Sequence, residues 1–219
     1  MSDSTRVFFW EDVTIPAGRT THYLANHGGK AWSFTADVKF PLFGSWGHLR
    51  PLGEAPRVVN LRELDWRRLW GFLSQQFGSE QQASNLESWW IRSAVDRSGG
   101  WDRFMLPGPG CPTLDECAKG ATRPCVIQQK VRVREGAAGE YLDWFVQKAK
   151  PAAQRAGWQP LTWLRAMHSS FIVTLFAAPD WSRVLDLAGA LPDPDAAWEA
   201  QVETAAMQAW AGSGYLQRG

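Results

Sequence analysis

The sequence predicts an α+β fold made of two copies of one small β-α-β-β-α-α-β repeat, fused in a single chain. The first observation is a gapless match at an offset of 118 residues, where VTIPAGRTTHYL (13–24) lies over VRVREGAAGEYL (131–142). The second is that the match resumes at an offset of 115, pairing Asp65-Trp66 with Asp180-Trp181. A period of this length is far longer than that of solenoid repeats, so each copy is expected to be a small domain.

The expected boundaries follow from a stretch rich in proline, glycine and small polar residues, LPGPGCPTLDECAKGATRP (106–124). The three cysteines lie in and just after it, and their odd number and spacings of five and seven residues fit neither a disulfide framework nor a zinc site. We therefore expect reduced cysteines and no metal. The predicted segments are a first repeat at 1–107, a linker at 108–123 with Cys111 and Cys117, and a second repeat at 124–219 that contains Cys125.

Each repeat opens with a short strand of alternating apolar residues, predicted at 8–15 and 126–133. A helix follows, and in the second repeat GEYLDWFVQKAKPAAQRAGW (139–158) places its apolar residues near one face. The counterpart in the first repeat carries Gly28 and Gly29, which weaken a helix. Two further strands are expected at 46–50 and 57–63, and at 160–167 and 171–177.

The later part of each repeat is predicted to be mostly helical. Asp65 and Asp180 suit helix N-caps, because a carboxylate there accepts hydrogen bonds from free backbone amides. An antiparallel sheet with helices on one face leaves its other face uncovered, so the two sheets should face each other and form a barrel with a pocket inside it or beneath the helices. The closing elements are a helix at 81–95 and at 196–210, then a short strand at Gly100-Trp101 and at Gly214-Tyr215.

Three motifs of the second repeat carry a family resemblance. They are the strand-Gly-helix opening VRVREGAAGEYLDWF (131–145), Gly157-Trp158 at the end of the helix, and FIVTLFAAPDWSRV (171–184), where a strand runs into a capped helix. On these motifs the chain resembles the dimeric α+β barrel superfamily, specifically its NIPSNAP-like and EthD-like members. The resemblance implies two ferredoxin-like repeats forming an intramolecular pseudo-dimeric α+β barrel. Such relatives include cofactor-free monooxygenases, isomerases, cyclases and haem-binding barrels, so the fold leaves the activity open.

Composition limits the class of partner. The net charge of +1 and the isoelectric point near 7.8 give no excess of basic residues for nucleic acid or anionic lipid. No apolar run reaches the length that a bilayer requires, and the start MSDSTRVFFWEDV lacks the pattern of a signal peptide. We expect a cytoplasmic, monomeric pseudo-dimer whose partner is a hydrophobic small molecule, and a homodimer formed through tryptophan-bearing helices stays open.

Candidate site residues follow from the alternation of side chains along the predicted strands. Val13 and Val131 should pack on helices, which turns their neighbours toward the inside of the barrel. The second strand of each repeat should follow the same rule. The residues expected to face the barrel are Trp10, Asp12, His48 and Arg50 in the first repeat, and Gln128, Lys130, Trp163 and Arg165 in the second.

His48, Asp12 and Arg50 are the predicted catalytic residues. A histidine titrates near neutral pH and exchanges a proton with a carbon acid, while a neighbouring carboxylate orients its ring. Arg50 would then hold an enolate or carboxylate of the substrate. The alternative is structural, with His48 exposed and Asp12 and Arg50 forming an ion pair. The residues expected to bind substrate are Trp10, Trp46, Tyr23, His22, Trp163 and Arg165.

Two classes of function follow. Fourteen tryptophans favour a flat or polycyclic ligand, although most are expected in the core. The first class is a cofactor-independent enzyme that isomerises, cyclises or oxygenates a polyketide, aromatic or terpenoid metabolite. The second is a non-catalytic protein that binds haem or another hydrophobic ligand. Phosphate-binding glycine loops and Gly-x-Ser-x-Gly motifs are missing from the sequence, which disfavours nucleotide-dependent and triad chemistry.

Overall fold

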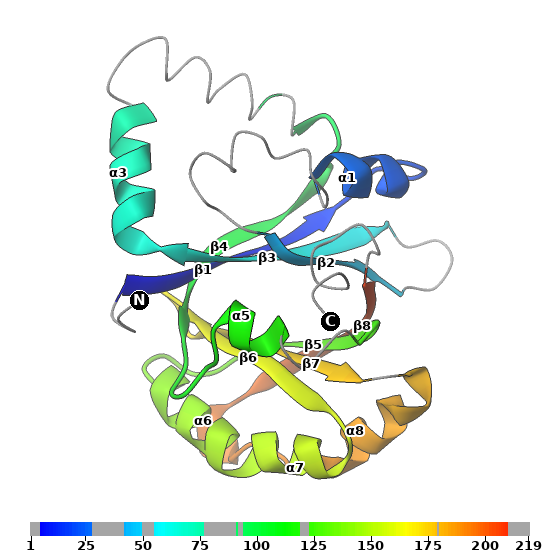
Figure 1. The fold of residues 1–219 in the computed structure, drawn as a ribbon. Coiled ribbons are helices and arrows are strands. Elements are labelled where there is room, and N and C mark those ends of the chain that lie inside the picture. Colours follow the sequence, from blue (N-terminus) through cyan, green and yellow to red (C-terminus); the bar gives the residue numbers. More distant parts are fainter. Residues whose placement is uncertain are drawn as a thin grey trace.

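The protein is a closed barrel of eight antiparallel strands with helices on its outside, as the ribbon in Figure 1 shows. The computed structural model describes residues 5–27, 42–49, 55–76, 91, 94–118, 123–178 and 180–209. Within these residues, no helix combines the length and the apolar character needed to cross a membrane. The predicted α+β class and the barrel are confirmed.

The strands follow one another around the barrel in the order β1-β3-β2-β8-β5-β7-β6-β4, and the last pairs with the first. Because the sheet closes on itself, neither half leaves an open edge. The strands are β1 (Arg6–Thr14), β2 (Leu42–His48), β3 (Arg57–Asp65), β4 (Gly99–Pro107), β5 (Cys125–Arg132), β6 (Gln159–Ala166), β7 (Phe171–Ala178) and β8 (Gln201–Ala209).

The two halves of the barrel pair their strands in the same way. In the first half β1 lies between β3 and β4, and β3 also pairs with β2. In the second half β5 lies between β7 and β8, and β7 also pairs with β6. Two seams, β2 with β8 and β4 with β6, join the halves. This equivalence is what two fused repeats would give, while the duplication itself and its boundaries stay predictions.

Helices cover the outer face of each half (Figure 1). Asp65 and Asp180 cap them as predicted, accepting hydrogen bonds from the backbone amides of Arg67 and Ser182 at 2.9 Å. The helical segments are α1 (Thr20–His27) and α3 (Trp66–Gln76) in the first half, and α6 (Ala138–Trp144), η2 (Phe145–Ala149), α7 (Lys150–Arg155), η3 (Trp181–Arg183), α8 (Val184–Ala190) and η4 (Ala196–Trp198) in the second.

The helix predicted at 139–158 is present but is not a regular α-helix throughout. Its middle, η2, is a π-helical turn, and Pro151 follows directly at the start of α7. Proline has no backbone N–H and its ring crowds the preceding turn, so the α-helical hydrogen-bond ladder is interrupted there. The apolar face survives the interruption, since Tyr141, Phe145 and Ala149 are all buried.

One predicted element is wrong, and others lie outside the described residues. The expected helix at 196–210 is instead a short 3-10 turn followed by strand β8. Alanine favours helix, but pairing with β5 over eight residues overrides that preference. The second strand runs over 42–48 rather than 46–50. Arg50, Gly214-Tyr215 and most of the helix expected at 81–95 lie outside the described residues.

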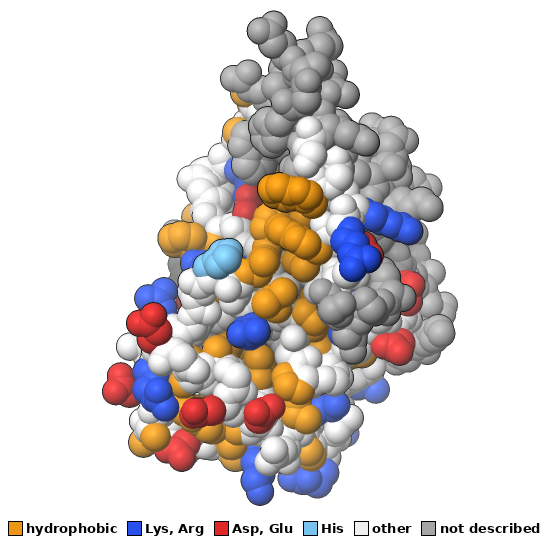
Figure 2. Space-filling model, turned by 90° about the vertical axis from the view of Figure 1, so that its left-hand side faces the viewer, with side chains coloured by type: hydrophobic (Ala, Val, Ile, Leu, Met, Phe, Trp, Pro, Cys, Tyr) orange, Lys and Arg blue, Asp and Glu red, His pale blue; other side chains and the backbone are white. Residues whose placement is uncertain are grey.

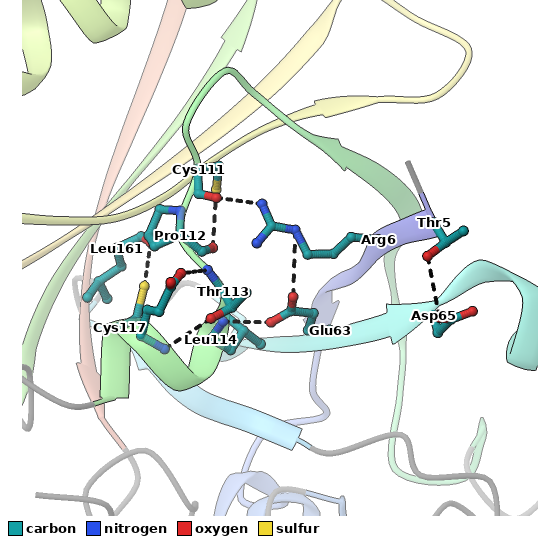
Figure 3. A network of polar contacts seen from close by, with 11 residues as sticks. Thr5, Arg6, Glu63, Asp65, Cys111, Pro112, Thr113, Leu114, Cys117 and Leu161 are labelled. Atoms are coloured by element: carbon teal, nitrogen blue, oxygen red, sulfur yellow. Dashed lines mark hydrogen bonds and ion pairs between the residues drawn. The ribbon is translucent and has the colours of Figure 1, made fainter. Parts of the chain in front are cut away.

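The predicted linker is part of the core. It contains a short helix, α5 (Leu114–Ala118), which lies between the two sheets in Figure 1 and is held from both sides in Figure 3. The backbone amide of Leu114 donates to Glu63 of the first half at 2.6 Å, and the Cys117 thiol donates to the carbonyl of Leu161 in the second half at 2.9 Å. The cysteines are free thiols, as predicted. Burial raises the pKa of the Cys111 thiol to about 12.

Candidate functional site

Side chains from opposite strands meet inside the barrel. Trp10 and Asp12 point inward from β1, and they meet Gln128 and Lys130 of β5, the strand diametrically opposite in the strand order. The Trp10 indole N–H donates to Oε1 of Gln128 at 3.0 Å, and Nζ of Lys130 lies 3.4 Å from Oδ2 of Asp12. The predicted inward face of both opening strands is confirmed. Each contact joins residues 118 apart, the offset of the sequence match.

Asp12 is the centre of this cluster, and its side chain is fully buried. Arg57 on β3 approaches it with two donors, Nη2 at 2.7 Å from Oδ2 and Nε at 2.9 Å from Oδ1. Lys130 adds a second positive charge, and the amide of Gln128 lies 3.4 Å away. A buried carboxylate requires such partners, because an isolated charge away from water is very costly.

The structure brings His48 to the same carboxylate. Its Nε2 lies 3.7 Å from Oδ1 of Asp12, and its side chain is only 1% exposed. This distance is longer than a hydrogen bond and allows direct charge attraction when the ring is protonated. Trp46, two residues earlier on β2, is fully buried in the main core. Of the predicted catalytic set, His48 and Asp12 are therefore neighbours, and Arg50 lies outside the described residues.

The barrel reaches solvent beside this cluster. Lys130 forms an ion pair of 2.5 Å with Glu203, whose side chain is 58% exposed. Next to it, the Arg103 guanidinium lies over the rings of Trp101 and Phe171, at 5.3 and 4.8 Å from their centroids. Trp101 is itself exposed. Charged and aromatic side chains thus line this end of the barrel, in contrast to the other end, where α5 lies.

The predicted orientation of Trp163 and Arg165 is wrong. Trp163 packs against Phe145 of η2, with ring centroids 5.7 Å apart, and its N–H donates to the carbonyl of Pro109 at 2.8 Å. Leu164 takes the inward position instead, since it pairs with Val173, which pairs with Lys130. The cause is the alignment offset: Trp46 pairs with Val59 and through it with Asp12, so its counterpart is Leu164, 118 residues later, and not the residue at an offset of 115.

His22 and Tyr23 lie on α1, outside the barrel. His22 is half exposed, and its Nδ1 is 3.1 Å from both carboxylate oxygens of Asp96, which also pairs with Arg19 at 2.6 Å. Burial opposes ionisation of Asp96, but the hydrogen bond from Arg19 and the charge of His22 together lower its pKa. Tyr23 is buried, and its hydroxyl accepts a hydrogen bond from Asn60 at 2.8 Å.

A second buried polar cluster, which was not predicted from the sequence, surrounds Glu11 on the helix side of the first sheet. Glu11 lies 3.9 Å from Nε of Arg62 and 3.7 Å from Nη1 of Arg97. Asn60 continues the cluster and accepts a hydrogen bond from Ser45 at 2.5 Å. Burial raises the pKa of Glu11, an effect that Arg62 and Arg97 oppose. Burial also lowers the pKa of Arg62. The sequence does contain a signal for this cluster, because Glu11 and Arg62 occupy strand positions whose side chains should point toward the helices.

The described residues do not fit a haem in the second half. The space between its sheet and helices is filled by Tyr141, Phe145, Trp163 and Phe176, all buried. None of His22, His48 and His168 borders that space, since His22 lies on α1, His48 faces Asp12 and His168 lies in the turn between β6 and β7. In the part of the chain that the structure describes, no group of three or more His, Cys, Asp or Glu could hold a metal ion.

Comparison with solved structures identifies the fold. A candidate monooxygenase from Fusobacterium nucleatum has a TM-score of 0.57 at 6% identity, covering 94% of this chain and 92% of that chain. A mutant chlorite dismutase from Candidatus Nitrospira defluvii gives 0.56 at 12% identity, with 98% and 95% covered. A candidate chlorite dismutase gives 0.54 at 9% identity, with 97% and 98% covered.

These neighbours share the dimeric α+β barrel fold with this protein. At such low identity the likeness concerns the fold alone. No protein-family model and no curated protein matches the sequence. The NIPSNAP-like and EthD-like subfamily resemblance stays a prediction, and the activity has to be argued from the side chains inside the barrel.

Proposed function

We propose that the protein is a cofactor-independent enzyme that transfers protons on a hydrophobic small molecule. The single observation that carries this proposal is the enclosed pair of His48 and Asp12, with Nε2 and Oδ1 3.7 Å apart. A histidine beside a carboxylate, shielded from water, is a common acid–base arrangement. Isomerisation, cyclisation or oxygenation could each begin from such a proton transfer.

The proposed first step is removal of a proton from a carbon next to a carbonyl. Nε2 of His48 takes the proton, and the electrons of the broken C–H bond form the C=C bond of an enolate with the negative charge on oxygen. Asp12 stabilises the resulting imidazolium through its charge. Arg50 is proposed to stabilise the enolate oxygen. Return of the proton to a different carbon gives an isomer, and attack of the enolate on a second carbonyl closes a ring.

The substrate class is inferred from the rings around the pair. Trp10 packs against Phe171 with centroids 5.5 Å apart, and Trp46 lies 6.0 Å from Phe43. Flat aromatic surfaces of this kind bind planar apolar molecules well. The proposed substrate is therefore an aromatic, polyketide-type or terpenoid ketone, which would reach the pair from the barrel end where Trp101 is exposed.

Deuterium exchange tests the proposal. Purified protein would be incubated in D2O with 2-tetralone, an enolisable bicyclic ketone, and deuterium at the acidic carbon followed by NMR. We expect exchange above buffer, and a loss of about a hundredfold in His48→Gln, the usual size of a general-base contribution. Asp12→Asn should act in the same direction but less strongly. His22→Ala and His168→Ala serve as controls and should be nearly silent.

Three outcomes would redirect the assignment. If every variant retained wild-type exchange, acid–base chemistry at His48 would be excluded and a ligand-binding role would be favoured. If instead Tyr23→Phe or Glu11→Gln abolished exchange while His48→Gln did not, the reaction would belong to the cluster on the helix side of the sheet. A visible absorption band in the purified protein would favour the haem alternative.

The domain organisation is part of the proposal. We propose that residues 1–107 and 124–219 arose by tandem duplication and together form a monomeric pseudo-dimer. The matching strand pairings of the two halves support this, as do the contacts between residues 118 apart. Since each sheet buries the inner face of the other, neither half should form a stable monomer alone. Ultracentrifugation of residues 122–219 would contradict this if they stayed monomeric and unfolded cooperatively.

A further inference from the structure

Two adjoining hollows lie on the surface beside the start of β1. Their volumes are about 490 and 330 Å³, and both are lined by Arg6, Pro107 and Arg165. Volumes of this order are typical of sites for small ligands. We call the two together the Arg6–Arg165 groove. Arg6 is six residues before Asp12 on an extended strand, so the groove lies about 20 Å from the His48–Asp12 pair.

The middle of the groove carries two guanidinium groups, those of Arg6 and Arg165. Arg6 is held in place by two partners, donating to the carbonyl of Cys111 at 2.5 Å and facing Glu63 at 3.7 Å, as Figure 3 shows. Arg165 is exposed, and it forms no ion pair with the part of the chain that the structure describes. The acidic residue among those lining the groove is Asp143, on α6. A ligand with one negative charge would therefore complement Arg165.

One side of the groove is apolar. Its lining includes Val7, Leu106, Met167 and Trp66. The Trp66 ring stacks on Trp70 with centroids 6.2 Å apart and meets Phe104 edge-on at 5.8 Å, so its position is fixed by packing. Figure 2, which views the molecule from the side of α3, shows a band of hydrophobic side chains with isolated basic ones. This side suits the apolar body of a ligand.

The other side is a rigid wall formed by the start of the linker. The backbone N–H of Gly108 donates to the carbonyl of Trp163 at 2.8 Å, and the Trp163 indole donates back to Pro109 at 2.8 Å. A Cβ at Gly108 would lie 2.6 Å from the Trp163 ring, so only glycine allows this approach. The wall exists before any ligand binds, which reduces the entropy lost on binding.

We propose that the Arg6–Arg165 groove binds a small amphipathic carboxylate. Arg165 pairs with the carboxylate, Arg6 lies behind it in its ion pair with Glu63, and the apolar body lies along Trp66 and Met167. A guanidinium suits this task because its planar donors match the two oxygens of a carboxylate. The site is separate from the proposed proton-transfer pair and does not depend on it.

Calorimetric titration of the full chain with 1-naphthoate tests the proposal, with 1-naphthalenemethanol as the neutral analogue. Arg165→Gln should raise the Kd for naphthoate at least tenfold and leave that of the alcohol within twofold. Arg155→Gln, at an exposed arginine on α7, is the matched control and should bind naphthoate like the wild type. Met167→Ala should weaken both ligands, because the apolar side holds both.

Three results would overturn the proposal. The first is no measurable naphthoate binding by the wild type. The second is equal naphthoate affinity in Arg165→Gln and the wild type. The third is loss of naphthoate binding in His48→Gln, which would place the ligand inside the barrel. Wild-type affinity in His48→Gln supports the groove, whatever that variant does to deuterium exchange, so the two proposals can fail separately.

Discussion

The two sheets differ in the side chains that they turn to their helices, since the first sheet carries charged residues there and the second carries uncharged ones. In the first sheet these positions are occupied by Glu11, Asn60 and Arg62, all buried. By strand register, the same positions in the second sheet hold Gln129, Thr174 and Phe176. The two tyrosines 118 residues apart differ likewise, since Tyr23 accepts a hydrogen bond from Asn60 whereas Tyr141 packs on Trp144 and Trp198 with centroids 5.2 and 5.6 Å away.

The difference shows that one strand topology can be held together in two ways. The apolar layer of the second half is stabilised in proportion to the surface that it buries, and it is damaged by cavities. The polar layer of the first half depends on pairing, because a buried charge that loses its partner is strongly destabilising. Burial raises the pKa of Glu11. Residues with shifted pKa values are candidates for acid–base catalysis, so this layer is the main alternative to the His48–Asp12 pair as the catalytic site.

The largest expected effect is in the apolar layer. Phe176 is fully buried and its ring lies 5.9 Å from that of Phe145. Phe176→Ala should lower the free energy of unfolding by about 4 kcal/mol, from lost burial and the cavity left behind. Urea unfolding followed by tryptophan fluorescence measures this. A loss below about 1 kcal/mol would show that the second half is not close-packed there.

The next effect is in the polar layer. Arg62→Leu removes a main partner of Glu11 and leaves its carboxylate buried, so we expect a loss of about 3 kcal/mol in the same unfolding experiment. The double variant Glu11→Gln with Arg62→Phe copies the second half at both positions. It should recover most of that loss, because both charges of the pair are removed together and neither is left buried without its partner. Equal losses in the single and double variants would contradict a pairing-based layer.

A smaller effect is a pH dependence that comes from Glu11. Its folded pKa is raised, mainly by burial, so the folded state binds this proton more tightly than the unfolded state does. The contribution of Glu11 to stability is therefore present at low pH and is lost as pH rises from about 4.3, its unfolded pKa, through the folded value. Subtracting the unfolding free energy of Glu11→Gln from that of the wild type should give a difference that falls with rising pH. A difference that rises would mean that Arg62 and Arg97 outweigh burial.

The sequence predicted the parts of the site that simple alternation controls. β1 and β5 are regular strands flanked on both sides, so Trp10, Asp12, Gln128 and Lys130 face inward as expected. The assignment fails in β6 because this strand keeps the offset of 118 from β2, so His48 corresponds to Ala166, whereas an offset of 115 matches it with Trp163. The residue at which the offset changes from 118 to 115 is decided by strand pairing, which a local sequence pattern does not reveal.

Two other features were missed. The segment 201–209 reads as helix from its alanines, and only its pairing with β5 makes it a strand. Glu11 and Arg62 lie at strand positions that alternation turns toward helices, although charged residues on a strand usually face solvent. They can be buried because the carboxylate of Glu11 lies close to the guanidinium groups of Arg62 and Arg97. Arg97 comes from a distant part of the chain, so a local pattern does not reveal this pairing.

The most direct test of the account compares the two faces of the first sheet in one assay. Deuterium exchange into 2-tetralone would be measured for His48→Gln and for Tyr23→Phe, each checked by its unfolding transition to be folded. The account predicts a loss of about a hundredfold for His48→Gln and a rate within a few-fold of the wild type for Tyr23→Phe. Full exchange in folded His48→Gln, with loss in Tyr23→Phe, would contradict it and assign the reaction to the helix side of the sheet.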